Sequence, residues 1–402
     1  MIKKITTGKH AGYYSIRIQP MNKVTGKRES WPIQYAKTKN EAKAIERKMW
    51  ADYEDGYNYG DANDVFSESF EKYVKQRHSE MSWSPVTYKA WNYSVKVFKE
   101  YFPKTKIKDI DQRTVNQFAH QYVLDHHSGI SKTSVIARRL VHMRHFFNTL
   151  VGHSVSVNPV PERPLNVFFR ESEFSTKRKR YLFNNEELRL IKQFIQSELV
   201  KDNITSWGTK LAIWIDLETG MRPGEIQALR FENLVINEGY PTFKIDDSWS
   251  DNSKKFSGSL KSRPHGSYRY CLPVSQELAD FFDEYHQKQT KFLKNHGMTN
   301  PRNLVFLNLH DYKACSTMIP ITQHSMNDML KHICQEIGID PDNEQLSMYS
   351  FRHTICTKLA NKPGISYPWA AARMGHTLEM FMHTYVKTDR DREQQMMVTW
   401  LS

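Results

Sequence analysis

The chain has 402 residues, 39% of them hydrophobic, which is enough for two or three folded domains. Its formal net charge of +13 favours a polyanionic partner, nucleic acid before an anionic membrane surface. No stretch of about 18 apolar residues occurs and no apolar segment follows the basic start, so we expect a cytoplasmic protein without a membrane span. The four scattered cysteines favour reduced core thiols over zinc ligands or disulfides.

The first predicted domain, residues 1–60, is strongly basic: its first 50 residues hold twelve Lys and Arg against three Glu, a net +9. Apolar and polar side chains alternate over residues 14–18, as in a half-buried strand, and residues 30–36 form a plausible second strand. Thr38 precedes Glu41 at capping-box spacing, which predicts a helix to about residue 55. We expect this β-sheet-plus-helix module to bind DNA, with a merely solvated module as the alternative. The basic residues expected at that interface are Arg17, Lys27 and Arg28.

Residues 65–156 are predicted to form a second, wholly helical domain. Apolar residues recur there at helical spacing in two stripes. The stripes are Trp91, Val95, Phe98 and Phe102, followed by Ile136, Leu140, Met143, Phe147 and Leu150. Arg138 and Arg139 lie off the second stripe, and we expect them to contact DNA phosphates, with ordinary solvated charge as the alternative.

Residues 157–182 are rich in proline and then in basic residues, which predicts an interdomain linker. Its basic run is expected to follow a phosphate backbone and consists of Lys177, Arg178, Lys179 and Arg180. Residues 183–402 alternate helical patterns with a β-rich insert around 241–274, so the fold class is multidomain and mainly α with small β elements. An acidic cluster in the insert is predicted to form a turn and no metal site. It comprises Asp246, Asp247 and Asp251.

Four features of the last domain carry candidate chemistry. Arg222 lies between a glycine turn and a helical pattern, where Glu225 can hold its guanidinium or the start of the helix. Arg352 begins another helical pattern, followed by His353, which we expect to support the site without reacting. Residues 258–274 are predicted to be a hairpin, with Lys261 near its turn and Tyr268, Tyr270 and Leu272 alternating on the return strand. The fourth feature is "MGHTLEMFMHTYVK", in which Leu378, Phe381, Met382 and Tyr385 have the spacing of one buried helical stripe.

Two arginines, a lysine, a histidine and a tyrosine suit attack on a phosphodiester. Guanidiniums can fork onto the non-bridging oxygens and stabilise the pentacoordinate transition state, so we expect no metal and no other cofactor. A tyrosine with a pKa of about 10 is a poor nucleophile, but a cationic site favours the phenolate and an imidazole can take its proton. The expected product, a 3′-phosphotyrosyl enzyme, keeps the energy of the broken bond, so ATP is not needed.

The motifs G-M-R-P-G-E, R-H-T and M-G-H-T-x7-Y resemble the G-x-R-x-x-E, R-H and L-G-H-x8-Y boxes of the tyrosine recombinases, the phage-integrase family. The order along the chain also matches that family. In this order the candidate catalytic residues are Arg222, Lys261, Arg352, His376 and Tyr385, with Lys254 and Lys255 as alternatives for the lysine. One position departs from the pattern, since Tyr349 stands where most members have the histidine of H-x-x-R, and any general-base duty must then lie elsewhere.

The resemblance implies a lambda-type or conjugative-transposon integrase with three domains. Residues 1–60 would bind arm sites through a three-stranded sheet, residues 65–156 would be a SAM-like core-binding domain, and residues 183–402 would be a mixed α/β catalytic domain. The implied partners are double-stranded DNA with core and arm sites, further copies of the chain in a tetramer, an excisionase and a DNA-bending host factor. The apolar residues near the C-terminus are expected to dock on a neighbouring protomer, with docking in cis as the alternative.

The function expected from the resemblance is site-specific integration of a prophage or mobile element. A chromosome-dimer resolvase and a type IB topoisomerase share the chemistry, although resolvases of this family usually lack the N-terminal module. A degenerate, non-catalytic DNA-binding protein is the alternative from another class, suggested by Tyr349.

Overall fold

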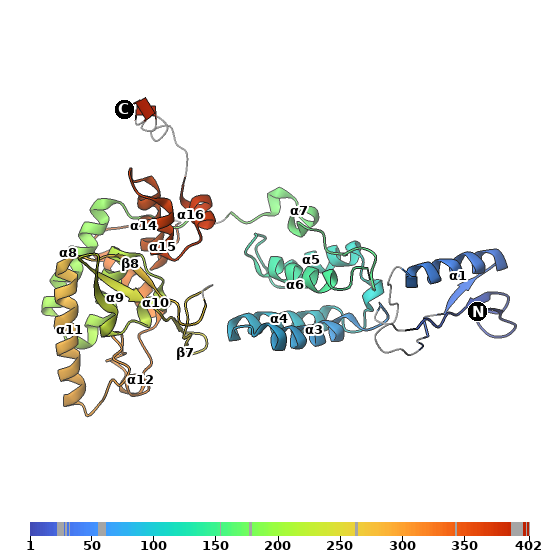
Figure 1. Ribbon diagram of the computed structural model, residues 1–402, viewed down its shortest axis with the longest axis horizontal. Coiled ribbons are helices and arrows are strands. Elements are labelled where there is room, and N and C mark those ends of the chain that lie inside the picture. The colour runs from blue at the N-terminus through green and yellow to red at the C-terminus, as the bar shows by residue number, and fades with distance from the viewer. Residues whose placement is uncertain are drawn as a thin grey trace. The chain divides into compact units, whose positions relative to one another are not determined.

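The computed structural model (Figure 1) describes residues 1–21, 28, 30–31, 33–54, 62–152, 154–176, 179–261, 264–341, 344–386, 397–398 and 400–401. The chain divides into two compact units, residues 1–177 and 178–402. In the described residues, no helix has both the length and the apolar character needed to cross a membrane. Three residues expected to contact DNA lie outside the described residues: Lys27, Lys177 and Arg178.

The N-terminal module is a three-stranded antiparallel sheet with one helix packed on it. Its strands β1 (Ile2–Lys4), β2 (Tyr14–Ile16) and β3 (Gln34–Ala36) pair in that order, and α1 (Lys39–Glu54) covers them. The predicted capping box is confirmed, because Thr38 Oγ1 accepts the Glu41 N–H at 3.2 Å and the Glu41 carboxylate accepts the Thr38 N–H at 3.1 Å. Ile16, Ile18 and Trp31 lie in a small apolar core, while the predicted DNA contacts Arg17 and Arg28 are exposed.

The rest of the first unit is a helical bundle. Its elements are α3 (Phe66–Met81), α4 (Pro85–Tyr101), η1 (Ile107–Asp109), α5 (Gln112–Asp125), α6 (Val135–Asn148), α7 (Pro164–Phe168) and η2 (Glu171–Glu173). The two predicted apolar stripes are buried in its core, except that Leu150 is only partly buried. The predicted linker is shorter than expected, because Leu165, Phe168 and Phe169 belong to the same core. A proline at the first turn starts α7 instead of preventing it.

Arg139 is not a DNA contact, which corrects the sequence prediction. Only 3% of it is exposed, and its Nη1 donates to the Ala90 carbonyl at 3.0 Å and to Ser94 Oγ. Ser94 Oγ lies 2.7 Å from Nδ1 of His142, whose ring stacks on Trp91 with centroids 3.8 Å apart. The guanidinium therefore ties α6 to α4 inside the bundle, whereas Arg138, one position earlier, is exposed.

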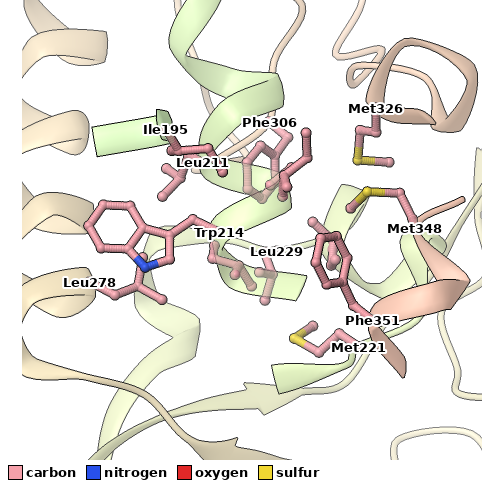
Figure 2. Close-up of a cluster of buried hydrophobic side chains, with 14 of the residues drawn as sticks. Ile195, Leu211, Trp214, Met221, Leu229, Leu278, Phe306, Met326, Met348 and Phe351 are labelled. Carbon is pink, nitrogen blue, oxygen red and sulfur yellow. The ribbon is translucent and has the colours of Figure 1, made fainter. Parts of the chain in front are cut away.

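The second unit is built around α9 (Ile204–Thr219), a helix buried on most of its surface. It packs against α8 (Asn185–Lys201), α11 (Gln276–Asn295), α13 (Gln323–Glu336) and α14 (Tyr349–Asn361). Figure 2 shows part of this core, in which Trp214 and Leu211 of α9 lie among side chains from other elements, including Phe306 and Phe351. The remaining helices are α10 (Pro223–Gln227), η3 (Phe231–Asn233), α12 (Tyr312–Ser316), α15 (Tyr367–Met374) and α16 (Leu378–Tyr385).

The β-rich insert differs from the predicted hairpin. Strand β8 (Arg269–Pro273) pairs with β5 (Tyr240–Ile245), and β5 pairs with β4 (Leu234–Asn237), all antiparallel. The strands β6 (Trp249–Ser250) and β7 (Lys255–Phe256) form a separate two-stranded hairpin. On β8 the buried residues are Arg269 and Cys271, so the face predicted to be apolar is the less buried one.

The acidic cluster of the insert serves the local turns. Asp247 Oδ1 accepts the N–H groups of Ser248 and Gly258, each at 2.7 Å. Asp251 accepts from the Gln227 side chain at 2.9 Å, and Asp246 pairs with a neighbouring arginine.

Candidate active site

Arg222 is positioned by the junction between α9 and α10. The glycine turn ends α9 at Gly220, with a φ of 60°, and Pro223 then starts α10. Glu225 makes both of the contacts that the sequence offered as alternatives: its Oε2 accepts the Arg222 backbone N–H at 3.0 Å, and its Oε1 accepts from Arg222 Nη1 at 2.9 Å. With 20% of its side chain exposed, Arg222 is fixed and still accessible to a ligand.

Arg352 lies on α14 and is 3% exposed. Its Nη1 donates to the Gly220 carbonyl at 2.9 Å, and its Nη2 donates to the Met374 carbonyl at the end of α15. A Cβ on Gly220 would lie 3.2 Å from Arg352 Cα, so the glycine permits this close approach between the end of α9 and α14. The two guanidiniums converge, since Arg222 Nη2 donates to the Gly375 carbonyl at 2.7 Å.

His376 follows the glycine that ends α15 and points its Nε2 at the Arg352 guanidinium, 2.5 Å from Nη2. Burial, followed by the charges of Arg352 and Arg222, lowers the pKa of His376 to about 3. The imidazole is therefore neutral near pH 7. Because a guanidinium only donates, Nε2 is the acceptor and the ring proton is assigned to Nδ1, which has no partner among the described residues.

Tyr385 ends α16 and is 6% exposed. Its ring lies nearly parallel to that of His376, with centroids 5.7 Å apart, and 5.5 Å from that of His353. Burial, and then the neighbouring Cys356 thiol, raise the pKa of the Tyr385 hydroxyl, while Arg352 opposes this rise. The predicted stripe is only half correct. Phe381 and Tyr385 are buried, whereas Leu378 and Met382 are 42% and 44% exposed.

Two other predicted residues lie around this cluster. Tyr349 is the first residue of α14, one turn before Arg352, and the Arg180 guanidinium lies 5.5 Å above its ring. Arg180 Nη1 also donates to Ser347 Oγ at 2.8 Å. Lys261 follows β7, is exposed, and has no hydrogen bond or ion pair within the part of the chain that the structure describes. The structure thus brings together Arg222, Arg352, His376 and Tyr385 and leaves Lys261 outside their contacts.

Two buried residues of this region were not singled out from the sequence. Asp216, on α9, is fully buried, and neither of its carboxylate oxygens has a hydrogen-bond partner among the described residues. The signal for it was an acidic residue inside the apolar run "LAIWIDLE". Arg269, on β8, pairs with Glu225 at 2.5 Å and is 6% exposed. Its position in the predicted strand did not indicate that it would be buried.

The arrangement defines a cationic site suited to an anion such as a phosphodiester, with a tyrosine at its edge. No group of three His, Cys, Asp or Glu that could hold a metal ion occurs among the residues placed by the structure. The model of the phage integrase family matches residues 182–392, and the chain belongs to this family, the tyrosine recombinases.

Several solved structures share this fold. The Tn1549 transposon integrase bound to transposon right end DNA is 17% identical, with a TM-score of 0.62, over 84% of this chain and 100% of that one. The XerH recombinase bound to its difH substrate is 16% identical, with a TM-score of 0.55, over 91% and 90%. A lambda integrase dimer bound to a core site is 14% identical, with a TM-score of 0.50, over 95% and 91%. No curated protein sequence matches the chain.

Proposed function

We propose that the protein is a site-specific DNA integrase of a prophage or integrative mobile element, which cuts and rejoins strands at attachment sites through a 3′-phosphotyrosyl intermediate. The observation that carries this proposal is the convergence of Arg222 and Arg352 on the end of α15, beside His376 and Tyr385. Such a site stabilises the charge that develops on a phosphodiester during attack.

In the proposed step, the Tyr385 oxygen forms a bond to phosphorus while the bond from phosphorus to the 5′-oxygen breaks. Arg222 and Arg352 stabilise the additional charge on the non-bridging oxygens, and the Nδ1–H of His376 donates to one of them. Lys261 protonates the leaving 5′-oxygen. Because the two guanidiniums supply the positive charge, the proposed step needs no metal, and because the phosphotyrosyl bond conserves the energy for rejoining, it needs no ATP.

His376 is a poor acceptor for the tyrosine proton, because its pKa is low and its Nε2 faces Arg352. We propose instead that His353, expected from the sequence only to support the site, takes the proton of the Tyr385 hydroxyl, because its ring lies as close to Tyr385 and it is only half-buried. It directly follows Arg352 and would take over the role of the histidine that most members of the family have where this chain has Tyr349.

DNA binding by the other parts of the chain belongs to the same proposal. The exposed residues Arg17, Arg28, Arg138 and Lys179 would contact phosphates, those of the N-terminal module at arm sites and the others at the core site. The similar integrases were solved on DNA, one of them, lambda integrase, as a tetramer on a Holliday junction. We propose a tetramer on DNA here as well, assisted by an excisionase and a DNA-bending host factor.

The C-terminal tail would dock on a neighbouring protomer. Its described residues Met397, Val398, Trp400 and Leu401 are all exposed, which leaves an apolar segment that a second copy could cover. Deleting residues 390–402 should reduce synapsis and strand exchange but not the first cleavage. Wild-type strand exchange by the deleted chain would disprove docking in trans.

The proposal is tested with a nicked suicide duplex, which traps the covalent adduct. The DNA site for this duplex is first selected from random duplexes by binding to the full chain. Wild-type protein should form an adduct, and failure to do so would favour a non-catalytic DNA-binding protein. Relaxation of supercoiled plasmid that lacks the selected site would instead favour a type IB topoisomerase.

A further inference from the structure

Three guanidiniums donate hydrogen bonds to three consecutive carbonyl groups at the end of α15. The last carbonyls of a helix have no partner inside it and carry the negative end of its dipole, so they attract cations. The acceptors are the carbonyl oxygens of Arg373, Met374 and Gly375, and the donors, in the same order, are Arg269, Arg352 and Arg222. Two of these donors belong to the sequence motifs of the family, and the third, Arg269, does not.

Arg269 also neutralises the carboxylate that holds Arg222. Its Nη2 donates to Glu225 Oε2 at 2.5 Å, and its Nη1 donates to the Arg373 carbonyl at 2.5 Å. The two side chains are almost fully buried, at 4% exposure for Arg269 and 2% for Glu225. Without Arg269, Arg222 would be the remaining guanidinium partner of the buried Glu225 carboxylate among the described residues. The negative charge of Glu225 would then be compensated by Arg222.

Gly375 completes the arrangement. A Cβ at this position would lie 2.6 Å from Arg269 Nε and 3.1 Å from Arg222 Nη1, so both guanidiniums use the space that a side chain would fill. The same glycine connects α15 to His376. Arg269 therefore contacts the two parts of the site that orient Arg222 and His376, the Glu225 carboxylate and the end of α15.

We propose that Arg269 is a positioning residue for DNA cleavage, which acts by balancing Glu225 so that Arg222 remains available to the scissile phosphate. This inference rests on the proposed function. In the absence of Arg269, Arg222 would be held as the counter-ion of Glu225 and would turn less readily to the phosphate. The predicted loss is therefore in the rate of cleavage and not in the affinity for DNA.

The experiment compares Arg269→Gln, Glu225→Gln and the double variant in the full chain. Single-turnover adduct formation on the suicide duplex is measured at saturating protein, together with duplex affinity and melting temperature. Arg269→Gln should slow cleavage at least about 30-fold with duplex affinity within about 3-fold of wild type. The double variant should cleave faster than Arg269→Gln alone, because removing the carboxylate charge removes the need for Arg269.

Arg230→Gln is the matched control, because Arg230 pairs with Glu232 and Asp246 beside the same sheet. This variant should cleave the duplex at the wild-type rate. If Arg269→Gln is too unstable to assay, Arg269→Lys is used in its place. It keeps the positive charge and should retain part of the wild-type rate of adduct formation. Wild-type cleavage by Arg269→Gln, or a double variant no faster than that single variant, would overturn the inference. An adduct that fails to form with wild-type protein would instead overturn the proposed function.

Discussion

At the scale of single residues, the state of His376 decides how the site handles protons. Its pKa is lowered to about 3, so the ring stays neutral from pH 5 upward, and its available proton is on Nδ1. The ring is then a hydrogen-bond donor to phosphate and not the base that takes the tyrosine proton.

An asparagine at position 376 can supply a donor in place of Nδ1–H, whereas an alanine cannot. His376→Ala should slow adduct formation about 100-fold and His376→Asn about 10-fold or less, as expected for the loss of one donor. The ratio of the wild-type rate to the Asn rate should stay constant between about pH 5.5 and pH 8, because His376 does not titrate there. A ratio that changes around the ordinary histidine pKa of about 6.5 would show that His376 gains a proton in this range.

Asp216 provides a prediction about stability. Burial raises the pKa of this carboxyl well above its ordinary value of 3.8, although Arg352 opposes the rise. At a pH between the pKa of Asp216 in the unfolded chain and its higher pKa in the native state, the native carboxyl holds a proton that the unfolded chain has lost. The free energy of unfolding therefore falls as the pH rises through this range.

Asp216→Leu removes this cost together with the unpartnered carboxyl group. The free energy of unfolding should increase by about 1 to 3 kcal/mol at pH 7.5, seen as a higher melting temperature, and the gain should shrink toward pH 4. A variant less stable than wild type at every pH would indicate that the carboxylate is charged and stabilised by Arg352.

At the scale of elements, local signals predicted more than distant pairings did. The capping box at Thr38 and the contacts of Glu225 depend on residues three positions apart. The structure confirms the capping box and shows that Glu225 makes both contacts that the sequence offered as alternatives. The pairing of β8 with β5 was missed because the partner strands are separated by the β6–β7 hairpin. Nor could the sequence separate exposed Arg138 from buried Arg139, since neighbours on one helix differ only in the direction they face.

Gly375, at the end of α15, can be compared with a second glycine of the same unit, Gly338. Gly375 and Gly338 both have positive φ, 65° and 74°, but a Cβ would meet the two guanidiniums only at Gly375, since nothing lies within 4 Å at Gly338. Gly375→Ala and Gly338→Ala should each cost about 1 kcal/mol of stability from the backbone. Gly375→Ala alone should reduce cleavage, by about 100-fold. Equal cleavage rates of the two variants would show that crowding of the arginines does not matter.

At the scale of the whole molecule, separate parts of the chain are proposed to contact DNA. The N-terminal module carries the net +9 of residues 1–50 and has its own small core. Such a module can bind a second DNA duplex without taking part in the chemistry at the first.

Removing residues 1–61 should leave adduct formation on the suicide duplex within about 3-fold of wild type. The truncated chain should lose its capacity for a second duplex, and the dependence of affinity on salt should become weaker because fewer phosphates are neutralised. Both quantities can be measured by titrating labelled duplex at several salt concentrations. A truncated chain that still binds two duplexes would contradict a separate arm-binding role.

In the proposed reaction, Tyr385 becomes covalently attached to DNA. Its most direct test is to trap the adduct on the suicide duplex, digest both components and locate the nucleotide by mass spectrometry. A nucleotide is expected on the peptide that contains Tyr385, and no adduct is expected with Tyr385→Phe. A nucleotide found on any other residue, or an undiminished adduct with Tyr385→Phe, would contradict it.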